Sequence, residues 1–101
     1  IAARDDITAA FCTADLVAAG LQAGLLKLGK RIPEDISVMG FDNLSVSRMI
    51  YPALTTIDQS ILAKGRLAGN LIAAILDKKD VPRRTVTDVI IIERDSVARR
   101  R

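Results

Sequence analysis

Residues 8–43 read TAAFCTADLVAAGLQAGLLKLGKRIPEDISVMGFDN, and this stretch decides the fold. A short apolar run, 8–12, is followed by a polar turn, a helical pattern over about 16–28, and a second apolar run, 36–41. Gly29 and Pro33 end the helix, because glycine accepts the left-handed conformation there and proline cannot continue a helix. The second run is apolar on both faces, as in central parallel strands. The stretch therefore predicts a β-α-β unit and an α/β fold.

The remainder of the chain predicts four further elements. Residues 45–50 favour a short helix, 54–57 an extended piece, and the β-branched residues of 86–93 a strand. Ser60 is a candidate cap for a long helix that ends near Asp77. This helix is amphipathic, and we expect its apolar face to pack on one neighbour; that face comprises Ile61, Leu62, Gly65, Ala68, Gly69, Ile72 and Leu76.

The composition excludes several classes of function. The chain has one cysteine and no histidine, so imidazole-based metal sites and histidine-dependent triads are ruled out. No glycine-rich phosphate loop occurs. We therefore predict a non-enzymatic chain with no catalytic residue, no metal and no cofactor. Cys12 is expected to be an inert core residue. We expect neither a membrane span nor a secretory signal.

The charge balance argues against a nucleic-acid-binding face. Lys and Arg number 15 against 12 Asp and Glu, a net charge of +3. Arg99, Arg100 and Arg101 account for that excess, since without them 12 basic residues face 12 acidic ones. We expect these three arginines to form a solvated tail.

The first helix carries two apolar strips. At 100° per residue, Val17, Leu21, Leu25 and Leu28 gather on the side expected to cover the sheet. A helix that is apolar on two sides is buried on two sides. The second strip therefore predicts a subunit interface, with the interior of a larger protein as the alternative; it comprises Leu16, Ala19, Ala23 and Leu26.

Two aspartates follow the predicted parallel strands. Asp15 and Asp42 both stand at carboxyl ends of strands, the edge at which open α/β sheets bind ligands. For Asp15 we favour a helix N-cap. For Asp42 the pattern leaves two interpretations open, a turn residue or a ligand contact.

Several segments in fixed order resemble one protein family. Residues 10–20, 29–43, 52–57 and 92–96 are similar to the carboxyl-terminal part of the LacI/GalR (lactose/purine repressor) family of bacterial transcription regulators, so that the resemblance covers essentially the whole chain. It implies a periplasmic-binding-protein-like (type I) two-lobed fold in the cytoplasm. An amino-terminal helix-turn-helix domain, absent from these residues, would bind operator DNA. By the resemblance, residues 1–57 belong to the carboxyl-terminal lobe, 58–87 to the amino-terminal lobe, and 88–101 form a returning strand and basic tail.

The resemblance also implies site residues. Asp42 matches the family's effector-contacting aspartate, and Ala14 stands where sugar-responsive members often carry asparagine. Gln59 and Ile61 align with the lip of the cleft. The implied effector is a small molecule of the sugar, nucleoside or purine class. The implied contacts of a homodimer, or of a higher homo-oligomer, are Ala19, Gln22, Ala23, Leu26, Val46 and Ile50.

The sequence thus predicts the effector-sensing and dimerisation part of a LacI-type repressor. A ligand in the cleft would favour one orientation of the two lobes and so alter the spacing of paired DNA-binding domains. The alternative is a piece of a periplasmic sugar-binding or chemoreceptor protein, which shares the fold.

Overall fold

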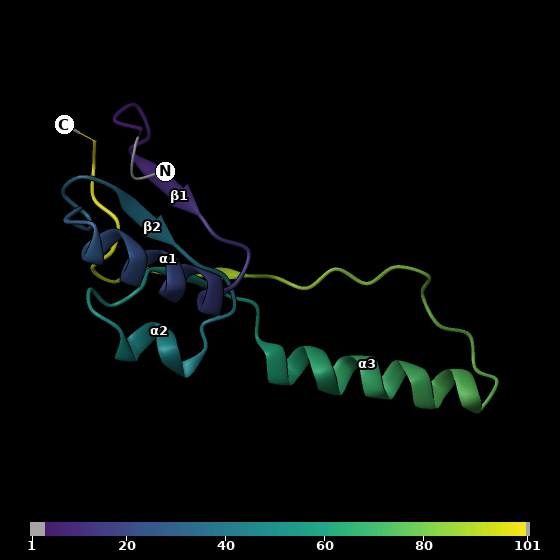
Figure 1. The fold of residues 1–101 in the computed structure, drawn as a ribbon. Helices are drawn as coiled ribbons and strands as arrows, with labels where there is room; N and C mark the ends of the chain where they lie inside the picture. The colour runs from purple at the N-terminus through teal and green to yellow at the C-terminus, as the bar shows by residue number, and fades with distance from the viewer. Residues whose placement is uncertain (1–3, 101) are drawn as a thin grey trace.

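A computed structural model describes residues 4–100 (Figure 1). Arg101, one residue of the predicted tail, lies outside this range, whereas Arg99 and Arg100 are exposed as expected. The elements follow the predicted order, and each strand is shorter than its apolar run. They are β1 (Ala9–Phe11), α1 (Asp15–Lys27), β2 (Ser37–Met39), α2 (Ser45–Met49), β3 (Thr56–Asp58), α3 (Ile61–Leu76) and β4 (Ile90–Ile92).

The predicted β-α-β unit is confirmed. Strands β1 and β2 pair in parallel, with Ala9 opposite Ser37 and Phe11 opposite Met39. On the other side of β2, Met39 pairs in parallel with Thr55. Strand β2 therefore has a neighbour on each side and is central, as its apolar pattern predicted.

Helix α1 covers the sheet with a face that only partly matches the prediction. Of the four residues assigned to the sheet side, Leu25 is buried in the core and Leu21 packs against it. Val17 and Leu28, assigned to the sheet side, are 56% and 70% exposed. The buried residues of α1 are Asp15, Ala18, Gln22 and Leu25. Two of these are polar, and each finds a hydrogen-bond partner elsewhere in the chain, so the helix is rotated relative to a wheel that places polar residues outside. The prediction was wrong for Val17 and Leu28 because a helical wheel takes no account of tertiary hydrogen bonds.

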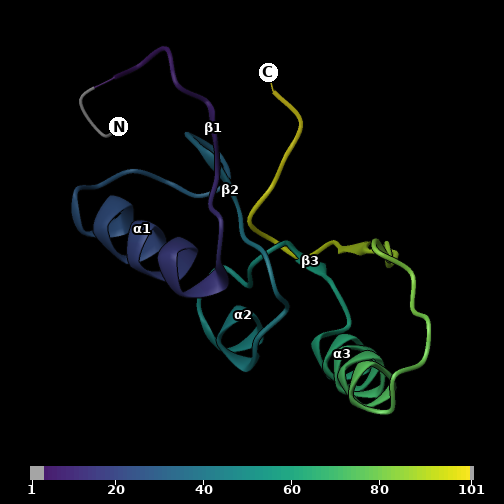
Figure 2. The same cartoon turned by 90° about the vertical axis from the view of Figure 1, so that its right-hand side faces the viewer.

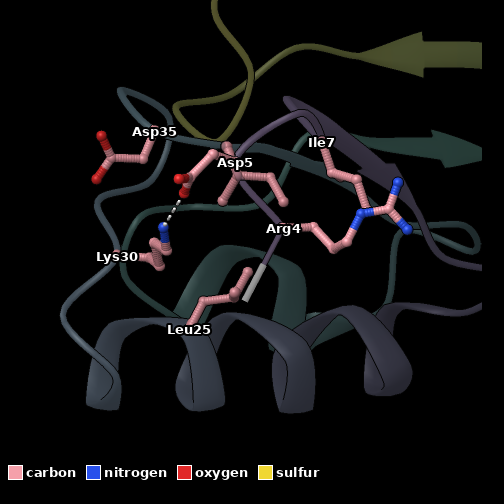
Figure 3. A pocket seen from close by; sticks show the side chains of 7 residues that line it. Arg4, Asp5, Ile7, Leu25, Lys30 and Asp35 are labelled. Atoms are coloured by element: carbon pink, nitrogen blue, oxygen red, sulfur yellow. Dashed lines mark ion pairs between the residues drawn. The ribbon is translucent and has the colours of Figure 1, made fainter. Parts of the chain in front are cut away.

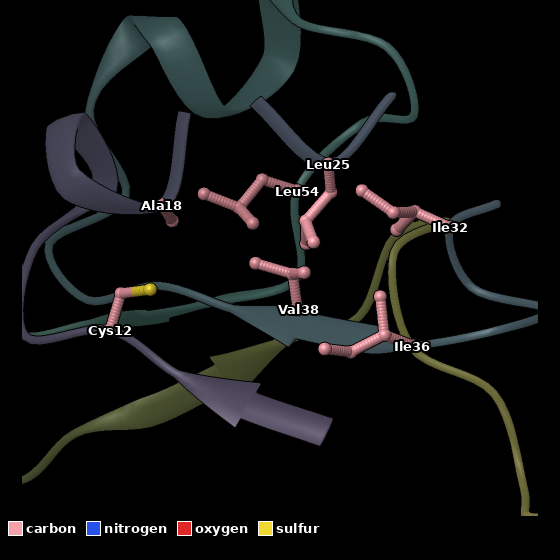
Figure 4. Packing of buried hydrophobic residues seen from close by; sticks show 7 residues of the cluster. All are labelled: Cys12, Ala18, Leu25, Ile32, Ile36, Val38 and Leu54. Atoms are coloured by element: carbon pink, nitrogen blue, oxygen red, sulfur yellow. The ribbon is translucent and has the colours of Figure 1, made fainter. Parts of the chain in front are cut away.

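The core lies between α1 and β2 (Figure 4). Ala18 and Leu25 on α1 point toward Val38 on β2, and Leu54 lies between the helix and the strand. Burial raises the pKa of the Cys12 thiol, which fits the predicted inert role. The full cluster comprises Cys12, Ala18, Leu25, Ile32, Ile36, Val38 and Leu54.

Helix α3 projects away from α1 and α2 (Figures 1 and 2). None of its residues is buried, and within residues 4–100 its apolar face has no element to pack on, contrary to expectation. Leu62 is 70% exposed and Leu76 77%. The chain's accessible surface is 7453 Å², against roughly 5,600 Å² for a compact protein of this mass. Much apolar surface is thus left for other protein to cover.

The chain leaves the sheet at β3 and returns to it at β4. These strands pair antiparallel, with Thr56 opposite Ile92 and Asp58 opposite Ile90. Ser60 precedes α3 as predicted, but its side chain makes no cap hydrogen bond and its backbone is left-handed, with φ of 53°. The Asp58 carboxylate accepts the Ser60 N–H instead, at 2.7 Å. In the described part of the chain, no helix combines the length and apolarity needed to cross a bilayer.

Candidate functional site

A strained turn follows β2 at Asp42 and Asn43. Their φ angles are 121° and 58°, a region that side chains with a Cβ rarely occupy and that costs about 1–3 kcal/mol per residue. Hydrogen bonds to the incoming strand hold the turn: Asp42 N–H donates to the Ile57 carbonyl at 2.9 Å, and Asn43 N–H to Thr56 Oγ1 at 3.4 Å. Of the two interpretations of Asp42, the turn is present in the structure, and it leaves the carboxylate half-buried at the sheet edge.

Asp15 holds the end of this turn by a hydrogen bond to Leu44 and is not a helix cap. Ala14 is the N-cap of α1, and Asp15 is the first helical residue. The Asp15 side chain is fully buried; Oδ2 accepts the Leu44 N–H at 2.7 Å, and Oδ1 accepts the Thr56 hydroxyl at 2.5 Å. The N-cap prediction was wrong because tertiary donors satisfy this carboxylate in place of the first N–H groups of its own helix.

Arg94 secures the other side of the turn. Its guanidinium donates to Asn43 Oδ1 at 2.8 Å, to Ser47 Oγ at 2.8 Å and to the Leu54 carbonyl at 2.9 Å. Its backbone N–H donates to Thr55 Oγ1 at 2.9 Å. The planar, many-donor guanidinium suits such a cluster of oxygen acceptors. The segment after β4 thus fixes the turn and the start of α2 together.

The structure brings two of the predicted site residues into direct contact. Gln59 Nε2 donates to Asp42 Oδ1 at 2.5 Å, although 17 residues separate them. Lys64, on the second turn of α3, donates through Nζ to Gln59 Oε1 at 2.9 Å. Ile61, the first residue of α3, is 48% exposed and has no polar atom in its side chain to join this group.

Ala14 lies close to the same edge. The Asp15 N–H donates to the Phe41 carbonyl at 2.9 Å, which joins the end of β1 to the chain just before Asp42. Beside this junction is an open hollow of about 380 Å³ lined by Phe11, Thr13 and Phe41. Asp42 follows Phe41 directly in the chain but does not itself line this hollow. Aromatic rings such as those of Phe11 and Phe41 can stack against a small ring-shaped ligand.

Four residues of this region were missed by the sequence analysis. Phe11, Phe41 and Arg94 lie within segments that resemble the family, but no role was assigned to them, and Lys64 lies outside those segments. The position of each aromatic residue at the end of a predicted strand was the available signal for Phe11 and Phe41. For Arg94 the signal was its place in the family-like segment 92–96, and Lys64 gave none, because only the folded chain brings it to Gln59 and Asp42.

The predicted dimer residues occupy α1, α2 and the residue after α2, and the two helices contact each other. On α1, Ala23 and Leu26 are exposed and Ala19 is half-buried; Val46 and Ile50 are also half-buried. Gln22 is an exception, since it is 1% exposed and its Nε2 donates to the Pro52 carbonyl at 3.0 Å. The structure therefore places Gln22 beneath this surface, where it joins α1 to the segment after α2.

A second pocket lies at the opposite edge of the sheet (Figure 3). It holds about 130 Å³, and an ion pair of 3.5 Å between Lys30 and Asp5 crosses it. That volume is below the range of about 300–1,000 Å³ that is usual for ligand pockets, and none of the predicted site residues lines it. Across residues 4–100, no three metal-ligating side chains come together.

Comparison with known proteins places these features in one family. Residues 2–97 match the periplasmic binding protein-like domain. The chain is 41% identical over 92 residues to the HTH-type transcriptional repressor PurR of Escherichia fergusonii, which covers 90% of this chain and 27% of the repressor. The chain thus spans about a quarter of the length of that relative.

Solved structures of transcription regulators have a similar fold. The transcription regulator CcpA of Lactococcus lactis superposes with a TM-score of 0.86 and 30% identity, over 90% of this chain and 34% of CcpA. The lac repressor dimer bound to operator and the anti-inducer ONPF gives a TM-score of 0.83 and 27% identity, over 89% of this chain and 32% of that one. The predicted α/β, periplasmic-binding-protein-like fold is confirmed.

Proposed function

We propose a function for this chain from one premise: it belongs to the periplasmic binding protein-like family, in the LacI/GalR group of transcriptional regulators. In its full-length protein, this chain forms part of the domain that senses an effector and joins two subunits. The carrying observation is the half-buried Asp42 carboxylate, which a strained and heavily hydrogen-bonded turn holds in contact with Gln59, directly after Phe41 in the chain.

The effector is a small molecule of the sugar, nucleoside or purine class. An ionised carboxylate is an acceptor only, so Asp42 selects a ligand that offers it a hydroxyl or a ring N–H. Gln59 and Ile61 border the ligand from the α3 side, and Ala14 borders it from the start of α1. Because Ala14 has no polar side-chain atom, the ligand's orientation depends on Asp42 and Gln59. No metal or other cofactor takes part.

Effector binding acts through the segments that join the sheet to α3. Strands β3 and β4 are the paired connections, and β3 begins in the hydrogen-bonded layer that holds the Asp42 turn. A ligand that contacts both Asp42 and the α3 side favours one orientation of α3 relative to the sheet. The shift in this equilibrium is limited by the ligand's differential affinity for the two orientations. In the full-length protein, the helix-turn-helix domain transmits that shift to operator DNA.

Dimerisation uses the surface of α1 and α2. Ala23 and Leu26 form its exposed part, Ala19, Val46 and Ile50 its half-buried part, and Gln22 supports it from below. Small side chains on a helix allow a partner backbone to approach closely. The lac repressor to which this chain is similar is a dimer, which supports a homodimer here.

The regulator is cytoplasmic and non-enzymatic. The other candidate, a periplasmic sugar-binding or chemoreceptor protein, shares the fold, but the relative that is 41% identical is a transcriptional repressor. That identity favours the regulator.

The test is an Asp42→Ala variant of the full-length protein. Ribose, adenosine and hypoxanthine are tested in thermal-shift assays, because a ligand that binds the native state raises the melting temperature. We expect one class to stabilise the wild type and not Asp42→Ala, with Asp77→Ala, at an exposed position after α3, behaving as wild type. If no probe stabilises the wild type, or if Asp42→Ala responds normally, the proposed function is wrong.

A further inference from the structure

A chain of hydrogen bonds connects α3 to the Asp42 turn. Lys64 Nζ donates to Gln59 Oε1 at 2.9 Å, and Gln59 Nε2 donates to Asp42 Oδ1 at 2.5 Å. The direction of the Gln59 amide follows from its partners. An ammonium only donates and a carboxylate only accepts, so the amide oxygen faces Lys64 and the amide nitrogen faces Asp42. Reversing the amide would break both hydrogen bonds.

The surroundings of these two hydrogen bonds strengthen them. Asp42, Gln59 and Lys64 are all half-buried, so each hydrogen bond is only partly exposed to competing water. Among residues 4–100, the Lys64 ammonium forms no ion pair, and the amide of Gln59 is the acceptor that it contacts. A charged group at each end of a neutral amide makes both hydrogen bonds charge-assisted.

We propose that Lys64 is a positioning residue for the effector site, acting on Asp42 through Gln59. Lys64 fixes the amide, the amide fixes Oδ1 of Asp42, and the second carboxylate oxygen, Oδ2, is left oriented for the ligand. A carboxylate oriented before binding loses less conformational entropy when the ligand arrives, which raises affinity. This inference rests on the proposed function and adds to it a residue outside the predicted site.

Because Lys64 lies on α3, the two hydrogen bonds also connect the effector site to the orientation of that helix. Asp42 lies in the turn that follows β2, whereas Lys64 lies on α3, the helix that projects away from the sheet (Figure 1). A change in the orientation of α3 therefore moves the donor that positions Gln59. Effector affinity and α3 orientation are coupled by this contact.

The first measurement requires no ligand. In full-length protein labelled with ¹⁵N on glutamine side chains, we expect the Gln59 amide protons to exchange slowly in the wild type and in Lys64→Arg, and rapidly in Lys64→Met. Arginine retains a charged donor, whereas methionine retains length and helix propensity without one. Rapid exchange of the Gln59 amide in the wild type would overturn the proposal.

The second measurement is a double-mutant cycle with ribose, adenosine and hypoxanthine as probes. We expect Lys64→Met to weaken binding of the responsive probe about three- to tenfold, the scale of one ordinary intramolecular hydrogen bond because Lys64 acts on the ligand indirectly, and Lys64→Arg to restore it. In a Gln59→Leu background, Lys64→Met should cause no further loss, because its route to Asp42 has been removed. Arg66→Met, which removes an exposed charge from the same helix, should bind as the wild type does.

The outcomes separate the two proposals. Unchanged affinity in Lys64→Met, or a full additional loss in the Gln59→Leu background, overturns the positioning role while the proposed function stands. If no probe binds the wild type, the proposed function fails, and the exchange measurement alone decides whether Lys64 positions Gln59.

Discussion

Asp15 and Thr56 lie 41 residues apart in the chain, and their side chains meet in a hydrogen bond of 2.5 Å between Thr56 Oγ1 and Asp15 Oδ1. Both residues are fully buried. The contact joins the start of α1 to the start of β3, directly under the turn that presents Asp42. Asp15, which the sequence pattern suggested as a helix cap, therefore joins two distant segments by a buried hydrogen bond.

Replacing Asp15 with alanine should destabilise the full-length protein by about 2–4 kcal/mol. The substitution removes the acceptor of the Thr56 hydroxyl and of the Leu44 N–H, and unpaired buried donors are costly. Denaturant unfolding measures the change. The Asp80→Ala variant, at an exposed loop position, is the control and should change stability by less than about 0.5 kcal/mol. Equal stabilities for the two variants would show that the buried tie contributes nothing.

Gly40→Ala should destabilise the protein by about 1–3 kcal/mol, whereas Gly20→Ala should not. A Cβ at position 40 would overlap Asp15 Oδ1 and stand 2.8 Å from Leu54 Cδ2, both in the packed layer under the turn. A Cβ at position 20 meets nothing within 4 Å, and alanine is favoured over glycine inside a helix by about 0.5–1 kcal/mol. Thermal unfolding of both variants tests this, and a Gly40→Ala protein as stable as the wild type would contradict it.

Arg94→Lys should weaken effector binding although it keeps the positive charge. One ammonium cannot reproduce the guanidinium's simultaneous contacts to Asn43, Ser47 and the Leu54 carbonyl. We expect affinity to fall about tenfold, with Arg84→Lys, at an exposed loop position, as the control. Calorimetry with the responsive probe measures both. Arg94→Lys binding as tightly as the control would mean that the turn keeps its shape without the guanidinium.

Ala23→Glu should dissociate the homodimer. The substitution places a charge on an exposed small residue of the proposed interface, where an unpaired buried charge is strongly unfavourable. Val17→Glu adds the same charge to an exposed position on another side of α1 and should leave the dimer intact. Light scattering gives the masses. A dimeric Ala23→Glu protein would move the interface elsewhere.

The segment before β2 should contribute an acid-sensitive part of stability. Hydrogen bonds from Arg31 to Asp35, of 2.8–3.1 Å, lower the pKa of Asp35 from 3.8 to about 2. Because the pKa is lower in the folded state, the stabilisation is complete above the unfolded value of 3.8 and is lost as the pH falls toward 2. Melting temperatures should therefore decline less steeply in this range for Asp35→Asn than for the wild type. Identical slopes would exclude the contribution.

Much of the architecture was predictable because it depends on local pattern. The order of the elements was predictable from the apolar runs, from the glycine and proline after α1, and from the amphipathic pattern of residues 60–77. The run at 36–41, which is apolar on both faces, predicted a central parallel strand. The exact orientation of α1 was not predictable, because buried Asp15 and Gln22 form hydrogen bonds with Leu44, Thr56 and Pro52, which no helical wheel contains.

The candidate site divides in the same way. Its position at the carboxyl ends of strands, and the family resemblance of Asp42 and Gln59, came from the sequence. The direct contact between these two residues, and the supporting roles of Lys64 and Arg94, came from the folded chain.

The sequence by itself determined the order of the elements, the α/β class and the family, because these follow from periodicity, turn residues and motifs that are contiguous in the chain. Only the tertiary structure decided which polar side chains are buried and which reach the Asp42 turn. Hydrogen bonds between residues 13 to 51 positions apart, such as those of Thr56 and Arg94, depend on the path of the backbone through space, which no local pattern encodes.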